Sequence, residues 1–213
     1  MTSTITATRK PSSRYKASPN RQVMGWRNLL LCLSFLGGLL GTTQAWAYSY
    51  AAAGKEPLIE GRQALLTALQ AGAKAKAQQA LDGMQKELGY LQHDYHVDYA
   101  KLLQLAVDKG DADQAQALLD RAFAAEIHRR LVGATQHFDD YQVAKVLVFK
   151  ANRFLELIEP RLSAANRQQA ETAIRACVKA IGNPGVFGVG RQPADPKAYD
   201  RAMKTLLQSL PQP

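Results

Sequence analysis

The stretch LQHDYHVDY, residues 91–99, holds side chains that could bind a metal ion. His93 and His96 are three residues apart, a spacing that places both imidazoles on one face of a helix. Two imidazoles on one face can supply two of the ligands that zinc, copper or iron require. The stretch therefore raises the hypothesis of a metal or haem site.

Further ligands for such a site would have to come from the two other histidines, His128 and His137, which flank a second expected helix end. Acidic side chains lie close to them in the sequence: Glu126, Asp139 and Asp140. The chain lacks the Glu-x-x-His pair of di-iron bundles, the CxxCH motif of covalent haem and the His-x-x-x-His motif. No cofactor is therefore predicted from a motif, and the four histidines remain a hypothesis for iron, copper, zinc or haem.

The simpler interpretation of residues 91–99 is structural, and two helix assignments support it. In one, a continuous helix over residues 74–108 buries a stripe of leucines with Tyr95 and leaves the histidines facing solvent. In the other, the stretch joins two helical hairpins, and Asp94 or Asp98 caps the next helix. Both assignments favour a polar bend or a solvated face over a site.

A second unusual stretch is NPGVFGVGRQPADP, residues 183–196. Its glycines have the order G-x-x-G-x-G, which is superficially like that of a phosphate-binding loop. However, the stretch comes after a helix rather than a strand and lacks the Lys-Ser/Thr pair, which argues against nucleotide binding. An exposed loop holding several apolar side chains is costly, so we expect Phe187 to fold back over the bundle end as a plug. The alternative is a ligand or partner loop formed by Phe187, Gly188, Gly190 and Arg191.

Nucleophilic catalysis has no motif in this chain. Ser163 and Ser209 are the only serines after Ser49. Cys177 lies on an apolar stripe with no histidine nearby in sequence, which is typical of a buried, inert thiol. We therefore expect a protein that is not an enzyme.

In the segments that contain these residues, the apolar residues recur at the three- and four-residue spacing of a helix. No segment shows the alternation of apolar and polar residues that is typical of a strand. Helices are predicted over residues 56–71, 74–92, 97–109, 111–133, 141–162, 165–181 and 196–210. Residues 141–162 are apolar on most sides and are predicted to be the central helix. The predicted fold is all-α, a compact bundle of antiparallel helical hairpins with about seven helices.

A weak internal repeat offers an alternative fold. Gly72-x4-Ala77-Gln78-x2-Leu81-Asp82 recurs 38 residues later, starting at Gly110. Residues 109–123 resemble the turn and second helix of tetratricopeptide repeats, although the family's period is roughly 34 residues and its first-helix aromatic positions are missing here. The resemblance covers at most residues 56–133 and implies a short α-solenoid with a concave surface for a protein partner.

Residues 1–47 have the layout of an export signal. The segment holds six basic residues and no acidic one, then the apolar run at residues 29–40, then Ala45-Trp46-Ala47. This order is that of a signal peptide, and an apolar run of 12 residues is shorter than the about 20 of a membrane span. Cleavage is predicted after Ala47, leaving residues 48–213 as one periplasmic or secreted domain. The alternative is an inner-membrane anchor through residues 29–47.

The net charge of +9 is concentrated in that leader, and from Tyr48 onward 21 basic residues face 18 acidic ones. Nucleic-acid binding is therefore not expected. The sequence favours an exported, non-catalytic helical binding or accessory protein, with a protein partner in the periplasm or at the membrane surface. The alternative is a periplasmic metal- or haem-binding bundle that uses His93 and His96 with His128 or His137.

Overall fold

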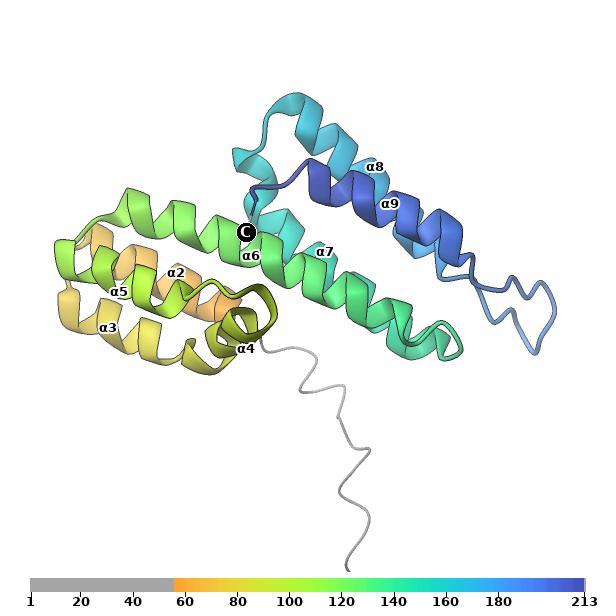
Figure 1. The fold of residues 1–213 in the computed structure, drawn as a ribbon, viewed down its shortest axis with the longest axis horizontal. Helices are drawn as coiled ribbons and strands as arrows, with labels where there is room; N and C mark the ends of the chain where they lie inside the picture. Colours follow the sequence, from red (N-terminus) through yellow and green to blue (C-terminus); the bar gives the residue numbers. More distant parts are fainter. Residues whose placement is uncertain (1–55, 213) are drawn as a thin grey trace, which may run out of the picture. The chain divides into compact units, whose positions relative to one another are not determined.

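Eight α-helices and one 3-10 helix form the regular structure of residues 56–212, the range that this computed structural model describes (Figure 1). They are α2 (Pro57–Gln70), α3 (Lys74–Asp82), α4 (Gln85–Tyr95), α5 (Tyr99–Lys109), α6 (Ala112–Thr135), α7 (Tyr141–Ile158), η2 (Glu159–Arg161), α8 (Ala164–Ala180) and α9 (Pro196–Gln208). The predicted all-α fold is confirmed. The expected leader, residues 1–47, lies outside the described residues.

Side-chain caps begin many of these helices. Five α-helices start after an aspartate or serine whose side chain accepts a hydrogen bond from a backbone N–H of the first turn: Asp98, Asp111, Asp140, Ser163 and Asp195. Such caps satisfy backbone donors that a helix start leaves without a partner. At α9 the cap Asp195 is followed by Pro196, which needs no N–H partner, so the start predicted from the sequence is confirmed.

The helix predicted over residues 74–92 is wrong, because the chain breaks between α3 and α4. The break falls at Gly83 and Met84, where the backbone N–H of Met84 bonds back to the carbonyl of Leu81 at 3.0 Å. Met84 is fully buried, and its side chain packs where a Cβ on Gly61 would otherwise stand. Gly61 on α2 and the turn between α3 and α4 therefore allow α2 to lie close to that turn.

The central helix is α6 rather than the predicted residues 141–162. α6 packs against α2, α4, α5, α7 and α9, whereas α7 buries one face and leaves Phe149 exposed. Alanines on several sides of α6 allow these close approaches: Ala115, Ala122, Ala124, Ala125 and Ala134 are all buried. The sequence predicted this helix but not its central position, because the buried ion-pair partners Asp120 and Glu126 make it look less apolar than residues 141–162.

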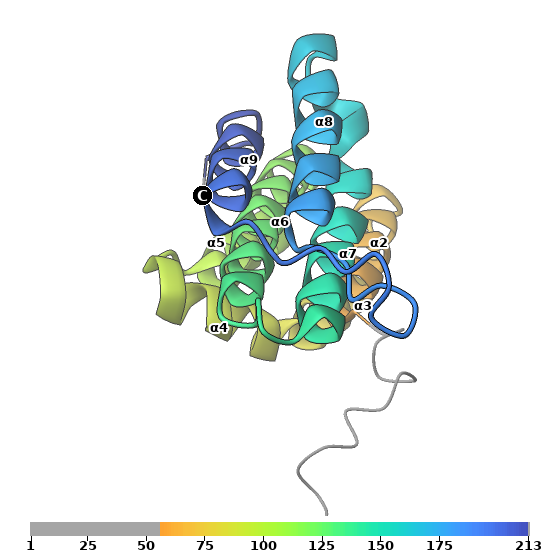
Figure 2. The ribbon, with the colours of Figure 1, turned by 90° about the vertical axis from the view of Figure 1, so that its right-hand side faces the viewer.

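The helices form two groups around the α6–α7 pair. α2 to α5 lie on one side of this pair, and α8 and α9 form an antiparallel pair on the other (Figure 1), an arrangement that Figure 2 shows from the end. The stripes of α8 and α9 predicted from the sequence face inward; Ile174 and Cys177 on α8, and Tyr199 and Leu206 on α9, are buried. Among residues 56–212 no helix is both long and apolar enough to cross a membrane.

The internal repeat corresponds to two similar turns. Gly72 follows α2 and Gly110 ends α5, with φ of 65° and 69°, so each glycine takes the left-handed conformation that turns the chain. Ala77 and Ala115 are buried after these turns. The later helices do not continue the repeat, since α6 has 24 residues and α7 has 18. The fold is therefore a bundle of helical hairpins rather than a solenoid.

Candidate functional site

Residues 91–99 form a helix junction. α4 ends at Tyr95, and His96 takes a left-handed conformation with φ of 57°, which reverses the chain direction. Asp98 then caps α5 by accepting a hydrogen bond from the backbone N–H of Lys101 at 2.9 Å. The predicted hairpin junction is confirmed, with Asp98 as the cap, and the continuous helix over residues 74–108 is wrong.

The four histidines lie in different surroundings. His93 points into solvent, with Nδ1 lying 2.8 Å from Oδ1 of Asp94, and His96 is exposed at the junction. His128 is half-buried on α6, and its ring contacts the ring of Tyr95 at the junction rather than His93 or His96. His137 lies in the turn after α6, nine residues beyond His128 and so about 13 Å further along a helical path. Within residues 56–212 no three histidine, cysteine or acidic side chains gather as metal ligands would.

Tyr95 and His128 line a small pocket closed by the end of the chain. Their ring centroids are 5.5 Å apart, and the pocket of about 260 Å³ is also lined by Ala124, Leu207, Leu210, Pro211 and Gln212. Burial lowers the pKa of His128 and raises the pKa of Tyr95 to about 12. Both groups are therefore uncharged near neutral pH, and the pocket has apolar walls with two neutral polar groups.

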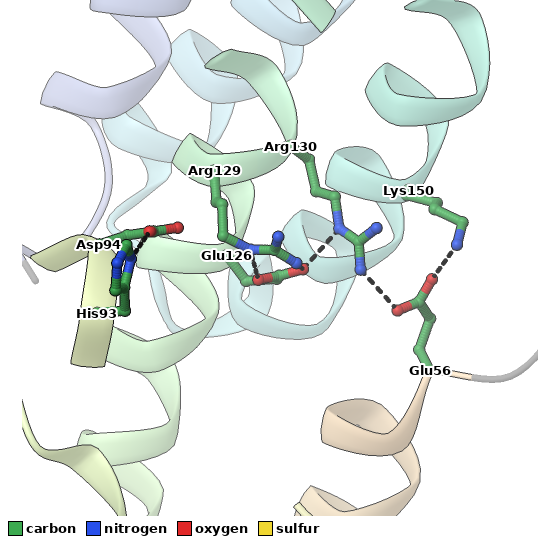
Figure 3. Close-up of polar contacts among 7 residues, drawn as sticks. All are labelled: Glu56, His93, Asp94, Glu126, Arg129, Arg130 and Lys150. Carbon is green, nitrogen blue, oxygen red and sulfur yellow. Dashed lines mark hydrogen bonds and ion pairs between the residues drawn. The ribbon is translucent and has the colours of Figure 1, made fainter. Parts of the chain in front are cut away.

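A cluster of five charged residues joins α2, α6 and α7, and Figure 3 shows it apart from the His93–Asp94 pair. We call this cluster the charged clamp: Glu56, Glu126, Arg129, Arg130 and Lys150. Arg129 donates two hydrogen bonds of 2.8 Å to the carboxylate of Glu126. Arg130 also bonds Glu126 and reaches Glu56 at 3.1 Å, and Lys150 Nζ lies 3.0 Å from the second oxygen of Glu56. Both carboxylates therefore have cationic partners.

The electrostatics of the charged clamp favour a structural role. Glu56 and Glu126 are 4% and 1% exposed, so an unpaired charge at either position would be costly. The hydrogen bonds to Glu126 raise the pKa of Arg129, which remains charged. Because cations engage both carboxylates, neither is available as a general base. The charged clamp holds the start of α2 against α6 and α7.

The sequence contained a local signal for part of the charged clamp. Glu126 precedes Arg129 and Arg130 by three and four residues, the spacing at which helical side chains pair. Glu56 and Lys150 come from other helices, and their pairing is a property of the tertiary fold alone. A second buried acid, Asp120, behaves similarly, since it accepts from Gln116 on α6 and pairs with Arg62 and Arg161.

Residues 183–192 form a β-hairpin between α8 and α9. Backbone hydrogen bonds of 2.8 Å join Asn183 and Gln192 in both directions, and bonds of 3.1 and 3.0 Å join Val186 and Val189. The chain turns at Phe187 and Gly188, whose φ values of 51° and 82° are both positive. A two-residue turn with two positive φ values is the type I′ turn that suits the twist of a hairpin.

Two glycines make this hairpin possible. A Cβ on Gly182 would lie 2.5 Å from the carbonyl oxygen of Gln192, and a Cβ on Gly185 would collide with the carbonyl oxygen of Val189. Both residues also have positive φ values, which a side chain would strain. Of the three glycines that resembled a phosphate loop in the sequence, Gly185 allows close backbone approach, and Gly188 and Gly190 take positive φ values in the hairpin.

The apolar side chains of the hairpin project into solvent. The exposed fractions are 73% for Val186, 103% for Phe187 and 79% for Val189. The prediction that Phe187 plugs the bundle end is therefore wrong. Figure 1 shows the hairpin extending beyond the ends of α8 and α9, so its turn lies away from the bundle. We call Val186, Phe187, Gly188 and Val189 the hairpin tip.

The predicted loop of Phe187, Gly188, Gly190 and Arg191 is thus displayed on the surface, and all four residues are exposed. Cys177 is fully buried, and burial raises the pKa of its thiol to about 12, as expected for an inert cysteine. Ser163 caps α8, and Ser209 donates its hydroxyl to the carbonyl of Leu206. These three side chains have structural roles.

No protein-family model, curated protein or solved structure matches this chain.

Proposed function

We propose that this protein is an exported, non-catalytic binding module and that the hairpin tip is the element that contacts its partner. The exposure of Phe187 at the hairpin tip is the observation that carries this proposal. An aromatic side chain of this size gains free energy when it leaves water, and its own chain does not cover it. A partner that covers it would supply this gain.

The backbone at the hairpin tip supports the same conclusion. Phe187 has a φ of 51°, and left-handed backbone costs a residue with a side chain about 1–2 kcal/mol. Two-residue turns of this type usually hold asparagine or aspartate before the glycine. The chain instead places a strained and exposed phenylalanine there, and strained residues often occur where a protein binds its ligand.

The bundle provides the support that a contact element needs. The backbone N–H of Asp195 bonds the carbonyl of Ala180 at 2.8 Å, which ties the two ends of the hairpin segment together. The helices that bear the hairpin pack on α6 and α7 through Tyr199 and Ile174, both buried. A small apolar element on a rigid base loses little conformational entropy when it binds.

Export is supported by the leader, whose basic segment, apolar run and Ala-x-Ala end precede the domain. In this account the protein serves as an accessory factor outside the cytoplasm and forms its contact through the hairpin tip.

Photocrosslinking in the organism that encodes the protein tests this proposal. A benzophenone amino acid at Phe187 should give a discrete adduct, and the same group at Phe149, an exposed aromatic residue on α7, should not. Replacing Val186 and Val189 with serine should remove the adduct at Phe187. Equal crosslinking at both positions, or none at Phe187, would show that the hairpin tip is not the contact element.

A further inference from the structure

The hairpin tip is small for a protein interface. Its three apolar side chains offer on the order of 400 Å² to a partner. A specific protein interface buries about 800 Å² on each side and surrounds its central residues with a rim. The neighbours of the hairpin tip are Pro184, Gly185, Gly190 and Arg191, which provide little surface for a rim. A lipid surface requires no rim, since the hydrophobic effect is not directional.

The backbone groups that flank the turn of the hairpin tip are hydrogen-bonded to each other. The N–H of Val186 donates to the carbonyl of Val189 at 3.1 Å, and the N–H of Val189 donates to the carbonyl of Val186 at 3.0 Å. Backbone groups must have partners where no water is available, and these two bonds satisfy the groups that flank the turn. The apolar side chains of the tip can therefore reach an apolar boundary while the backbone of Phe187 and Gly188 stays in the hydrated headgroup region.

The charges around the hairpin favour a bilayer surface. Arg191 is the only charged residue between positions 180 and 194, and the exposed residues that flank this segment are Lys179 on one side and Asp195 and Lys197 on the other. Basic residues behind an apolar tip can reach lipid phosphates while the tip enters the acyl boundary. The turn between α6 and α7, at the same end of the bundle, carries the exposed acids Asp139 and Asp140 (Figure 1). These acids should weaken the preference for anionic lipid.

The sequence that precedes the domain also favours lipid. Residues 29–40 form an apolar run within the expected export signal. Both interpretations of this leader, cleaved or retained, deliver the domain to the far side of a membrane. A lipid surface is then present in the compartment that the domain enters.

We propose that the hairpin tip inserts into the headgroup region of a lipid bilayer, with Phe187, Val186 and Val189 at the acyl boundary and Arg191 at the phosphates. This inference rests on the proposed function, because it names the partner of the same contact element. An insertion of three side chains binds weakly and reversibly, as a single lipid anchor does. The protein would thus sample a membrane surface rather than remain fixed to it.

Fluorescence at a single labelled cysteine tests the insertion. The full chain carries Cys32→Ser and Val189→Cys, and position 189 is labelled with the environment-sensitive dye NBD. Cys177 is buried and stays unlabelled. Vesicles of phosphatidylcholine, alone or mixed with phosphatidylglycerol, are added, and nitroxide-bearing lipids report the depth of the dye. The matched control has the dye at Gln208→Cys, an exposed position at the opposite end of α9.

If the tip inserts, the emission of the dye at position 189 should shift to the blue and be quenched by the nitroxide lipids. The dye at position 208 should show neither effect. Adding Phe187→Ser should weaken the partitioning that the dye reports by at least about tenfold. An unchanged spectrum at position 189, or equal shifts at both positions, would overturn the lipid proposal. A discrete protein adduct from Phe187 in cells, together with no response to vesicles, would retain the hairpin tip as the contact element and assign it a protein partner.

Discussion

Arg130 on α6 and Glu56, the residue that precedes α2, form an ion pair of 3.1 Å between positions 74 residues apart in the sequence. Arg130 also binds Glu126, so one guanidinium joins two buried carboxylates. Buried charges are tolerated when each one has a partner, and removing one partner leaves the other uncompensated. The charged clamp is therefore a point where a single substitution should have a large effect on stability.

The first prediction concerns Glu126. We expect Glu126→Ala to lower the free energy of unfolding by about 3 kcal/mol or more, because two arginines lose their carboxylate partner in a largely buried place. Urea denaturation measures this change. In the matched control, Glu171→Ala removes the solvent-accessible partner of Arg175 and should have a much smaller effect, because solvent screens this ion pair. Similar losses in both variants would contradict a structural role for the charged clamp.

The second prediction concerns pH and His128. Burial lowers the pKa of His128 in the folded protein below the usual 6.5, so at slightly acidic pH the unfolded chain binds more protons. The free energy of unfolding should therefore fall as the pH drops below the usual pKa towards the folded pKa. Between about pH 7.5 and about pH 5.5, His128→Gln should lose less stability than the wild type.

Gln92→Ala is the control for this pH prediction, because it changes an exposed side chain that carries no titratable group, and its pH dependence should match that of the wild type. Urea denaturation at each pH measures the free energy of unfolding. A His128→Gln variant with the same pH dependence as the wild type would show that His128 does not contribute to it.

The third prediction concerns the hairpin backbone. Gly185→Ala should open the hairpin, because the added methyl group would collide with the carbonyl of Val189. The bundle does not depend on this residue, so its unfolding free energy should change by less than about 1 kcal/mol. Limited proteolysis should cut residues 183–192 faster in this variant. Gln192→Ala, which changes an exposed side chain of the same hairpin and leaves its backbone hydrogen bonds in place, is the control and should remain resistant. Equal cleavage of both variants would show that backbone approach does not shape the hairpin.

The fourth prediction concerns metals. The histidines that the sequence grouped lie apart, with His93 in solvent and His128 against Tyr95. After incubation with iron, copper and zinc, we expect a His93→Ala, His96→Ala variant to retain as much metal as the wild type. Elemental analysis of protein purified without a His tag measures this. A stoichiometric metal that disappears in the variant would restore the metal-site hypothesis.

Much of the fold could be predicted from local sequence signals. Asp195 with Pro196 marked the start of α9, and the apolar stripe through Ile174 and Cys177 marked the inner face of α8. These signals are local, since a cap or a stripe acts within one helix. The break at Gly83 was missed because it depends on how Met84 packs against another helix.

The candidate sites were harder to predict, because tertiary contacts define them. Tyr95 rather than His93 or His96 meets His128, and the packing of α4 against α6 decides this. For Phe187, the apolar side chain predicted burial, but the hairpin extends beyond the ends of α8 and α9 and the side chain at its turn is exposed. The placement of the hairpin, which is a property of the tertiary fold, therefore reversed an expectation drawn from hydrophobicity.

The most direct test of the hairpin tip as a contact element is the accessibility of a cysteine placed on it. In a Cys32→Ser background, Val189→Cys should react quickly with a membrane-impermeant thiol reagent in the purified protein, because position 189 is 79% exposed. In cells of the organism that encodes the protein, the same cysteine should be protected, while Gln208→Cys reacts equally in both settings. Equally fast reaction of Val189→Cys in cells and in solution would contradict the proposal that a partner covers the hairpin tip.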